Sequence, residues 1–330
     1  MFRKITALVA TAAVSAMIMA GSAIAGPITM KFSHVVAENT PKGQMANKFR
    51  DLVAERLAGK VVVEVFPSSQ LFNDDQVLQA MLLGDVQLGA PALSKFGRYT
   101  KQLDLYDLPF LFKDMAAVDR FQNSEKGQEL LTSLDSKGFI GLGYLHNGLK
   151  QLSSHKPLHV PADAAGQKFR IMASDVLAAQ FQAVKATPLK SPFSEVFTLL
   201  QTKAIDGQEN TWSNIYSQKF FEVQPYITES NHGLLDYMVV TSAEFWNGLP
   251  EDIRAEVKKA LDEAIVFGNK VALDYDLEER QKIVDSKRSE IIVLTPEERA
   301  QWVEVMKPVW KQFEDKIGKD MIDAAFAANE

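Results

Sequence analysis

The segment from Pro250 to about Ser286 constrains the fold of this chain more than any other stretch. Apolar residues recur along it at helical spacing, and no proline interrupts it. At 1.5 Å per residue, a single helix of this length is roughly 55 Å long, which exceeds the width of one small domain. The alternative is two helices that break near Gly268. Because one glycine within a helix costs only ~1 kcal/mol, we expect a single helix that runs along two lobes.

The N-terminus has the layout of a secretory leader. Arg3 and Lys4 precede the apolar, alanine-rich residues 5–20, and the triplet AIA stands directly before Gly26. A basic start, a short apolar run and small residues at a cleavage site predict a signal peptide at residues 1–25; a buried N-terminal helix is the alternative. We therefore expect export to the periplasm. The chain has no cysteine, so we expect no lipid anchor, no disulfide bond and no cysteine metal site.

The charge balance limits the partners that we expect. The chain has 330 residues and a net charge of −6. Loss of the leader would remove two cations, Arg3 and Lys4, which changes the net charge to −8. An acidic surface disfavours nucleic acid and anionic membranes as partners.

Segments typical of strands alternate with segments typical of helices through the first two thirds of the chain. This order predicts an α/β fold in which helices cover a largely parallel sheet. The strands expected are 30–33, 61–66, 86–90, 139–145 and 168–172, and the helices expected are 41–57, 73–83 and 174–185. Ser191 and Pro192 predict the start of a further helix, with the serine as its cap. Near the C-terminus, TPEE at Thr295 predicts a capping box.

The sequence contains few patterns typical of catalysis. Its five histidines are not spaced as metal ligands, and neither a nucleophile elbow nor a phosphate-binding loop is present. We interpret Asp74 and Asp75 as helix-capping acids rather than a catalytic pair, because a helix start favours acids. We expect a protein that is not an enzyme and that holds neither a cofactor nor a metal.

The segment GQKFR, from Gly166 to Arg170, has the pattern expected of a binding strand. If it is extended, Lys168 and Arg170 share one face, which could be a solvated face or a binding face. The helix expected at 174–185 follows at once, so Arg170 lies near the carboxyl end of its strand. In open α/β sheets ligands bind at that end, and the arginine fork matches a carboxylate.

Seven segments together resemble the substrate-binding subunits of TRAP transporters, the DctP family. The resemblance extends from about Met30 to the C-terminus and depends on the order and spacing of the segments. They are SHVVAENTPKG, VFPSSQL, ALSKFGRYTKQLDLYDLPFLF, HNGLKQLSSHKPL, GQKFRI, SPFSEVF and DGQENTWSNIYSQKFFEVQPY. The resemblance implies a two-lobed, type II-like periplasmic binding protein with a hinge and a long helix spanning both lobes. It implies capture of an organic acid and its delivery to an ion-driven membrane permease.

The family's ligand positions match five residues of this chain. Arg170 matches the arginine that clamps a carboxylate, and Asn210 matches the asparagine after the Asp-Gly-x-Glu pattern. Lys150 stands where sugar-acid members often have arginine, and Lys95 is the basic position of the first lobe. Phe193 matches a ring that packs on the ligand, although its spacing also fits a core stripe.

Other candidate ligand residues depend on weaker patterns. Trp212 could form an apolar wall of the site or belong to the core, while Asn214 is expected to cap a helix. His34 and Lys42 flank the ENTPKG loop, and each could face the ligand or support the loop. Asn147, in the turn before Lys150, is a further candidate.

Three of the segments favour one class of ligand within the family. ENTWSN, SHVVAENTPKG and ALSKF are most similar to the branch that binds four-carbon dicarboxylates, such as succinate, malate and fumarate. A keto acid or an aldonic or uronic acid is the alternative ligand, and a periplasmic enzyme or a sensor subunit is the alternative class.

We expect a monomer whose chain crosses between the lobes more than once. Lobe I is predicted to comprise residues 26–147 together with about 236–275. Lobe II is predicted to comprise residues 148–235 together with about 276–330.

Overall fold

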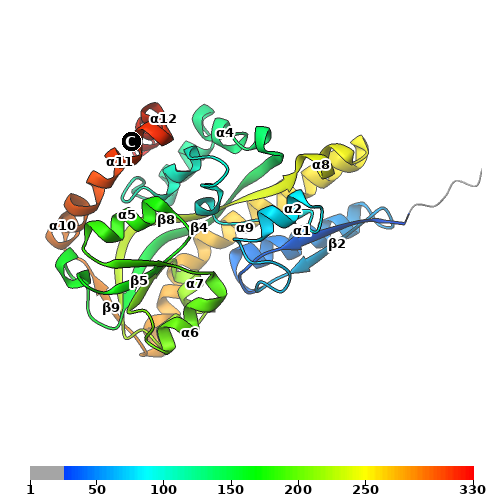
Figure 1. Cartoon of the computed structure of the whole chain (residues 1–330). Coiled ribbons are helices and arrows are strands. Elements are labelled where there is room, and N and C mark those ends of the chain that lie inside the picture. Colours follow the sequence, from blue (N-terminus) through cyan, green and yellow to red (C-terminus); the bar gives the residue numbers. More distant parts are fainter. Residues whose placement is uncertain (1–25) are drawn as a thin grey trace, which may run out of the picture.

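A computed structural model describes residues 26–330 of the chain (Figure 1). The leader predicted for residues 1–25 lies outside the described residues. The strands are β1 Ile28–Ser33, β2 Val61–Phe66, β3 Leu88–Gly89, β4 Phe139–Ser154, β5 Lys168–Ile171, β6 Thr187–Lys190, β7 Gly207–Asn210, β8 Tyr226–Ser242 and β9 Glu290–Val293. The α-helices are α1 Pro41–Arg56, α2 Val77–Leu82, α3 Met115–Gln122, α4 Glu125–Leu131, α5 Asp175–Ala183, α6 Val196–Gln201, α7 Trp212–Ser217, α8 Ala243–Gly248, α9 Glu251–Ser286, α10 Pro296–Met306, α11 Trp310–Ile317 and α12 Lys319–Ala327.

Two long antiparallel strands, β4 and β8, join the two lobes. The sheet order is β2-β1-β3-β8-β4-β7-β5-β6, and β9 also pairs with β8. Lobe I therefore holds the parallel strands β1, β2 and β3, whereas lobe II holds the parallel strands β5, β6 and β7. The pairing of β4 with β8 shifts register at three places, and the middle shift, between His146 and Gly148, coincides with the predicted lobe boundary. Bulges of this kind bend a strand, so this shift is suited to a hinge.

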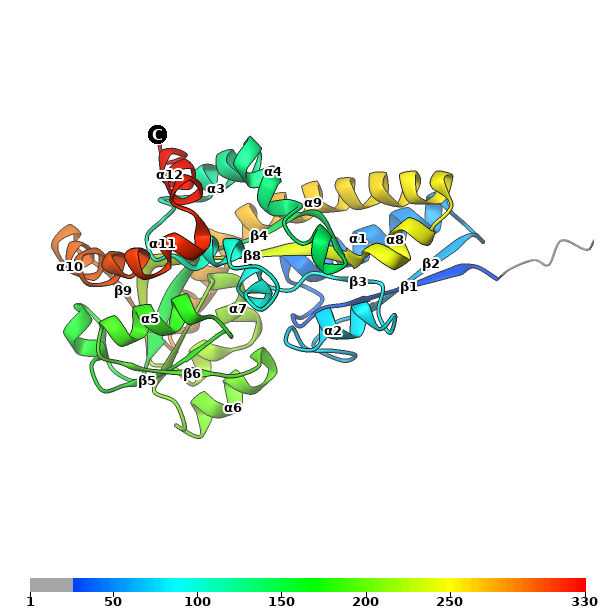
Figure 2. The same ribbon diagram turned by 45° about the horizontal axis from the view of Figure 1, so that its top comes forward.

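Helix α9 is continuous over 36 residues and lies along both lobes (Figures 1 and 2). The prediction of one long helix is confirmed, and the break near Gly268 is absent. A Cβ at position 268 would lie 2.7 Å from Met45 Cβ and 2.9 Å from Leu145 Cδ1. Gly268 therefore lets α9 approach α1 and β4 closely instead of ending the helix.

Most of the predicted elements are present. However, β4 continues to Ser154 instead of ending at residue 145, and the strands β6, β7, β8 and β9 were not predicted. The capping box at Thr295 is confirmed, because its side chain accepts from Glu298 N while Glu298 accepts from the Thr295 backbone. The predicted helix is present as α6, but the prediction that Ser191 caps it was wrong. A 3-10 turn over Phe193–Glu195 precedes α6, and the Ser191 hydroxyl has no partner among the described residues.

The last three helices divide between different neighbours. Helix α10 contacts α5, and its Trp302 shares a buried cluster with Phe181. Helices α11 and α12 instead contribute Phe313 and Met321 to the cluster that contains Phe121 of α3. The lobe boundaries drawn at 26–147, 148–235, 236–275 and 276–330 stay a prediction.

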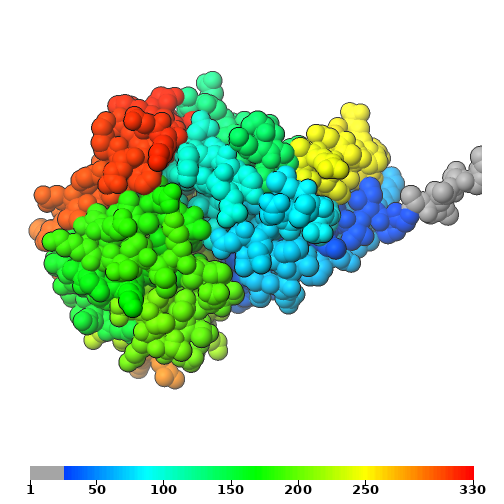
Figure 3. Space-filling view, viewed as in Figure 1, coloured from blue at the N-terminus to red at the C-terminus, as the bar shows by residue number. Residues whose placement is uncertain are grey.

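The two lobes meet face to face on one side of the molecule. In the space-filling view, the cyan surface of lobe I lies directly against the green surface of lobe II (Figure 3). Among the side chains that meet there, Lys101 Nζ lies 3.8 Å from Asp175 Oδ2 across the junction. Parallel strands of both lobes end at this junction, which is where ligands bind in open α/β sheets.

Candidate functional site

A cavity of about 30 Å³ lies between the lobes at the carboxyl ends of β5 and β7. Its volume is enough for about two water molecules. The lobe I and β8 lining is Val35, Val36, Asp74, Asp75, Ala92, Lys95, Leu235 and Tyr237, and the lobe II lining is Arg170, Met172, Phe193, Asn210 and Asn214. Both lobes thus contribute charged and amide side chains to one small space.

Arg170 is the most buried cation of the cavity lining, with 2% of its surface exposed. It stands near the end of β5, next to β7. Its Nε and Nη2 donate to the Ser191 carbonyl oxygen at 3.0 and 2.8 Å, which fixes one edge of the guanidinium. Burial lowers the pKa of Arg170 to about 10, so the side chain is cationic at neutral pH. The Nη1 edge remains able to bind a carboxylate.

Asn210 and Asn214 form a linked amide pair in the cavity wall. Asn214 Nδ2 donates to Asn210 Oδ1 at 2.7 Å, so the Nδ2 of Asn210 can donate to a ligand. The prediction that Asn214 caps a helix was wrong. The cap of α7 is Thr211, whose hydroxyl accepts from the Asn214 backbone.

Lys95 lines the same cavity from the lobe I side. Its Nζ donates to Asp75 Oδ1 at 2.7 Å, and only 4% of the lysine side chain is exposed. The neighbouring Asp74 accepts from the Ala92 backbone at 3.3 Å. The prediction that both acids cap a helix was wrong, because Asn73 accepts from the local backbone amides and α2 starts only at Val77.

Phe193 has both of the roles that its spacing allowed. It lines the cavity, and its ring also packs edge-on against Phe220 with centroids 6.0 Å apart. Trp212, in contrast, does not line the cavity. Its side chain is buried in the core of lobe II, and the Arg280 guanidinium lies 5.7 Å from its ring.

Lys150 is buried close to the sheet centre but does not line the cavity. Its Nζ donates to Glu209 Oε1 at 2.8 Å, and His232 Nε2 bonds the other oxygen of Glu209 at 2.9 Å. Burial opposes the charge of Glu209, yet Lys150 and His232 outweigh it and lower the pKa of Glu209 to about 2. A Cβ at Gly233 would lie 2.8 Å from Lys150 Cε, so this glycine leaves room for the lysine stem. Lys150 is thus already paired with an ionised partner.

Asn147 supports the cavity from behind. Its Nδ2 donates to the hydroxyl of Tyr237 at 2.8 Å, and its backbone N donates to Asp236. Tyr237 itself lines the cavity. The structure therefore places Asn147 one residue away from the lining.

His34 and Lys42 also lie behind the lining. Lys42 Nζ donates to the Ala90 carbonyl oxygen at 2.8 Å and lies 3.5 Å from the centre of the Tyr237 ring. Burial lowers the pKa of Lys42 to about 8. Burial and the nearby Lys42 charge lower the pKa of His34 to about 3, so this imidazole is neutral.

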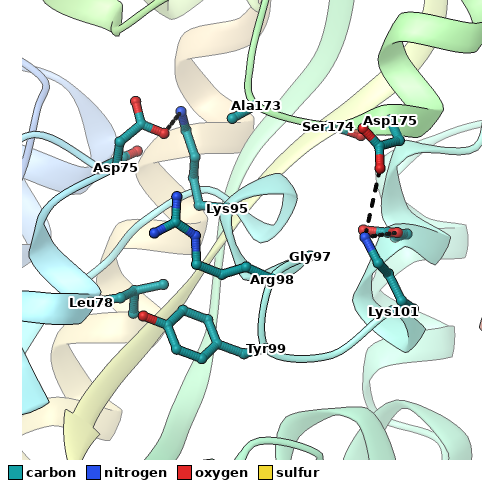
Figure 4. A pocket seen from close by; sticks show the side chains of 12 residues that line it. Asp75, Leu78, Lys95, Gly97, Arg98, Tyr99, Lys101, Ala173, Ser174 and Asp175 are labelled. Atoms are coloured by element: carbon teal, nitrogen blue, oxygen red, sulfur yellow. Dashed lines mark hydrogen bonds and ion pairs between the residues drawn. The ribbon is translucent and has the colours of Figure 1, made fainter.

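A second cavity of about 210 Å³ adjoins the first and shares Asp74, Asp75 and Lys95 with it (Figure 4). The rest of its lining is Leu78, Gly97, Arg98, Tyr99, Lys101, Asp104, Ala173, Ser174 and Asp175. Burial, and then the neighbouring Asp107, raise the pKa of Asp104 to about 7. This larger space joins the lobes through the Lys101–Asp175 pair.

Several lining residues could not be found from sequence patterns. Tyr237 and Leu235 lie in an apolar strand, LLDYMVV, that is typical of any core strand. Asp75 was interpreted as a helix-capping acid, and Arg98 belongs to no pattern that indicates a ligand residue. The glycine-containing run at the start of β4 did indicate a strand, and the Asp-Gly pair before β7 did indicate a turn.

The described residues contain neither a group of three or more His, Cys, Asp or Glu side chains that could hold a metal nor a helix long and apolar enough to cross a membrane.

Comparisons with known proteins agree on one family. Residues 32–316 match DctP, the bacterial extracellular solute-binding proteins of family 7. A C4-dicarboxylate-binding periplasmic protein DctP of Shewanella loihica is 69% identical, covering 93% of this chain and 91% of its own length.

Two solved structures have the same fold. A TRAP periplasmic solute-binding protein of Shewanella oneidensis with bound succinate superposes with a TM-score of 0.92 at 66% identity, covering 92% of this chain and all of the other. One from Pseudomonas aeruginosa with bound L-malate has a TM-score of 0.85 at 46% identity, covering 87% of this chain and all of the other.

Proposed function

This chain belongs to the DctP family of bacterial extracellular solute-binding proteins, and from this premise we propose that it captures a four-carbon dicarboxylate for a TRAP transporter. Succinate, malate and fumarate are the proposed ligands, and an ion-driven membrane permease is the proposed partner. Relatives at 69% and 66% identity that carry the C4-dicarboxylate name or bound succinate support this ligand class.

One observation carries the proposal most directly, the free edge of a buried arginine in the cavity between the lobes. Arg170 holds a full charge there, and its hydrogen bonds go to the neutral Ser191 carbonyl oxygen. A buried cation without an anion in contact is costly, and a carboxylate that binds it in two parallel bonds offsets that cost. The position therefore favours a carboxylate ligand.

The proposed ligand contacts come from both lobes. Arg170 binds the first carboxylate, Asn210 donates its amide, Phe193 covers the carbon chain, and Lys95 approaches from lobe I. Lys150, Trp212, Asn147 and His34, all predicted to contact the ligand, are proposed instead to support the lining from behind.

Closure of the lobes over the ligand is the proposed mechanism. The ligand favours the closed arrangement only because it binds that arrangement better than the open one. Residues from both lobes line one cavity, so closure adds contacts that an open cleft lacks. The bulge near His146 is the proposed hinge.

The proposal extends to location and assembly. We propose a periplasmic monomer whose leader, residues 1–25, is cleaved before Gly26, which intact-mass measurement of the exported protein tests directly. We also propose that the protein binds its ligand without turnover. Incubation with each acid followed by a search for product tests this, and co-purification with a permease rather than a kinase excludes a sensor role.

A thermal-shift screen tests the ligand. The protein is unfolded and refolded to remove bound acid, then heated with succinate, malate or fumarate, and in parallel with glucuronate, gluconate or pyruvate. A thousandfold excess over the dissociation constant adds ~4 kcal/mol of stability, a shift on the order of ten degrees. A shift with sugar acids or keto acids alone would contradict the dicarboxylate assignment.

A further inference from the structure

We infer that the second carboxylate of the ligand binds Lys95 by displacing the carboxylate of Asp75. This inference rests on the proposed function, because it concerns the distal half of the same diacid. It assigns a role in diacid binding to an ion pair that lies within one lobe.

The other cations near the cavity are held by partners that do not line it, whereas Asp75, the partner of Lys95, does. Lys150 is held by the ionised Glu209. Lys42 donates to a backbone carbonyl and does not line the cavity. Among the described residues, the lysine and arginine side chains that line the smaller cavity are Arg170 and Lys95. Arg170 can serve one carboxylate, so Lys95 is the group that can serve the other.

The Asp75 carboxylate already sits where a ligand carboxylate would bind. Its Oδ1 lies 2.7 Å from Lys95 Nζ, and 30% of the aspartate side chain is exposed. Its backbone amide is held by Asn73 Oδ1 at 2.9 Å, so the side chain can rotate while the turn stays in place. The smaller cavity holds only about 30 Å³, and movement of this side chain would extend it toward the larger one.

Arg98 can receive the displaced carboxylate. It lines the larger cavity together with Asp75. In Figure 4 its guanidinium is drawn next to the Lys95 side chain. Figure 4 draws an ion pair for Lys95 and for Lys101 but none for Arg98 among the residues shown. Transfer of Asp75 from Lys95 to Arg98 would keep both carboxylates paired once the ligand has bound.

This exchange takes place with diacids and not with monoacids. A monoacid can bind Arg170 but has no second group to replace Asp75. A diacid replaces one carboxylate on Lys95 with another, so the buried lysine is never left without an anion, a condition that would be strongly unfavourable. Asp75 thus competes with the ligand and lowers the affinity for diacids in particular.

Titration calorimetry with succinate and butyrate tests the inference, because butyrate has four carbons and a single carboxylate. The native protein is compared with Asp75→Asn, with Lys95→Met and with Asp85→Asn, which removes the same charge from an exposed turn. We expect Asp75→Asn to bind succinate roughly tenfold more tightly than Asp85→Asn. Lys95→Met should weaken succinate by at least roughly tenfold, and butyrate should change less than about threefold in every variant.

A double-mutant cycle tests the role of Arg98. Arg98→Gln should weaken succinate binding in the native background but not in the Asp75→Asn background, since no displaced carboxylate then needs a partner. If Asp75→Asn binds succinate no more tightly than Asp85→Asn while the native protein binds it, this inference alone is overturned. If the refolded native protein does not bind succinate, malate or fumarate, the proposed function fails and the inference fails with it.

Discussion

Lys150 and Arg170 are both almost completely buried cations at the centre of the molecule, yet their surroundings differ. Lys150 contacts the carboxylate of Glu209, which is also bound by His232. Arg170 contacts only a neutral carbonyl oxygen through its Nε and Nη2. The first cation belongs to a closed network, whereas the second keeps a free edge on a cavity. Of these two buried cations, the one with a free hydrogen-bonding edge on a cavity is therefore the better candidate for binding a carboxylate.

The largest expected effect would break the closed network. Lys150→Met leaves Glu209 buried without its main partner, so we expect a loss of about 3–5 kcal/mol in the free energy of unfolding. Urea denaturation measures it, and Lys258→Met, on the surface of α9, is the control. The double variant Lys150→Met with Glu209→Gln should lose less than the sum of the two single variants. A Lys150→Met protein of native stability that fails to bind succinate would reverse the comparison and make Lys150 a ligand residue.

The next largest effect concerns the cation with the free edge. Arg170→Ala should raise the dissociation constant for succinate roughly a hundred- to a thousandfold, with a smaller loss of stability than Lys150→Met. Arg170→Lys should also weaken binding, because a lysine keeps the charge but cannot form two parallel bonds. Calorimetry on both variants measures the change. A change below about threefold for Arg170→Ala would show that the carboxylate binds elsewhere.

The smallest expected effect is on the pH dependence of stability, and it concerns a buried acid rather than a buried cation. Asp104, in the larger cavity, has a pKa of about 7 against an ordinary value of 3.8. The folded state therefore holds this proton more tightly than the unfolded state, so its contribution to stability falls as pH rises from about 4 to 7. Asp104→Asn should remove this dependence, and the variant should gain on the order of 1–2 kcal/mol relative to the native protein between pH 5 and pH 8. Urea denaturation at both pH values measures it, and an equal difference at pH 5 and pH 8 would exclude the shift.

Local patterns predicted many of the elements of the fold and the place of Arg170 in its strand. Helical spacing and the absence of proline predicted α9, and the capping box predicted the start of α10. Arg170 could be placed near the end of a strand because a helix pattern follows it within a few residues. These features depend on residues one to four positions apart in the sequence, so the sequence alone is enough to predict them.

Local patterns failed where two residues compete for one role. Asn214 and Thr211 are both acceptable helix caps, and only the backbone path shows that Thr211 is used. Ser191 has the residue type of a cap, yet a 3-10 turn follows it. Asn73 accepts from the backbone amides of Asp75 and Gln76. The carboxylates of Asp74 and Asp75 are therefore not needed as caps, and both residues line the cavity.

The sequence by itself determined the α/β alternation, the long helix that joins the lobes and the type of residue that can hold a carboxylate. Only the tertiary structure decided which cations remain available. Lys150 meets Glu209 across 59 residues of chain, and Asn147 meets Tyr237 across 90. Spacing along the chain does not record such pairs, because they form only when β4 packs between β7 and β8. A buried charge is satisfied by whichever partner the folded sheet brings within hydrogen-bond distance.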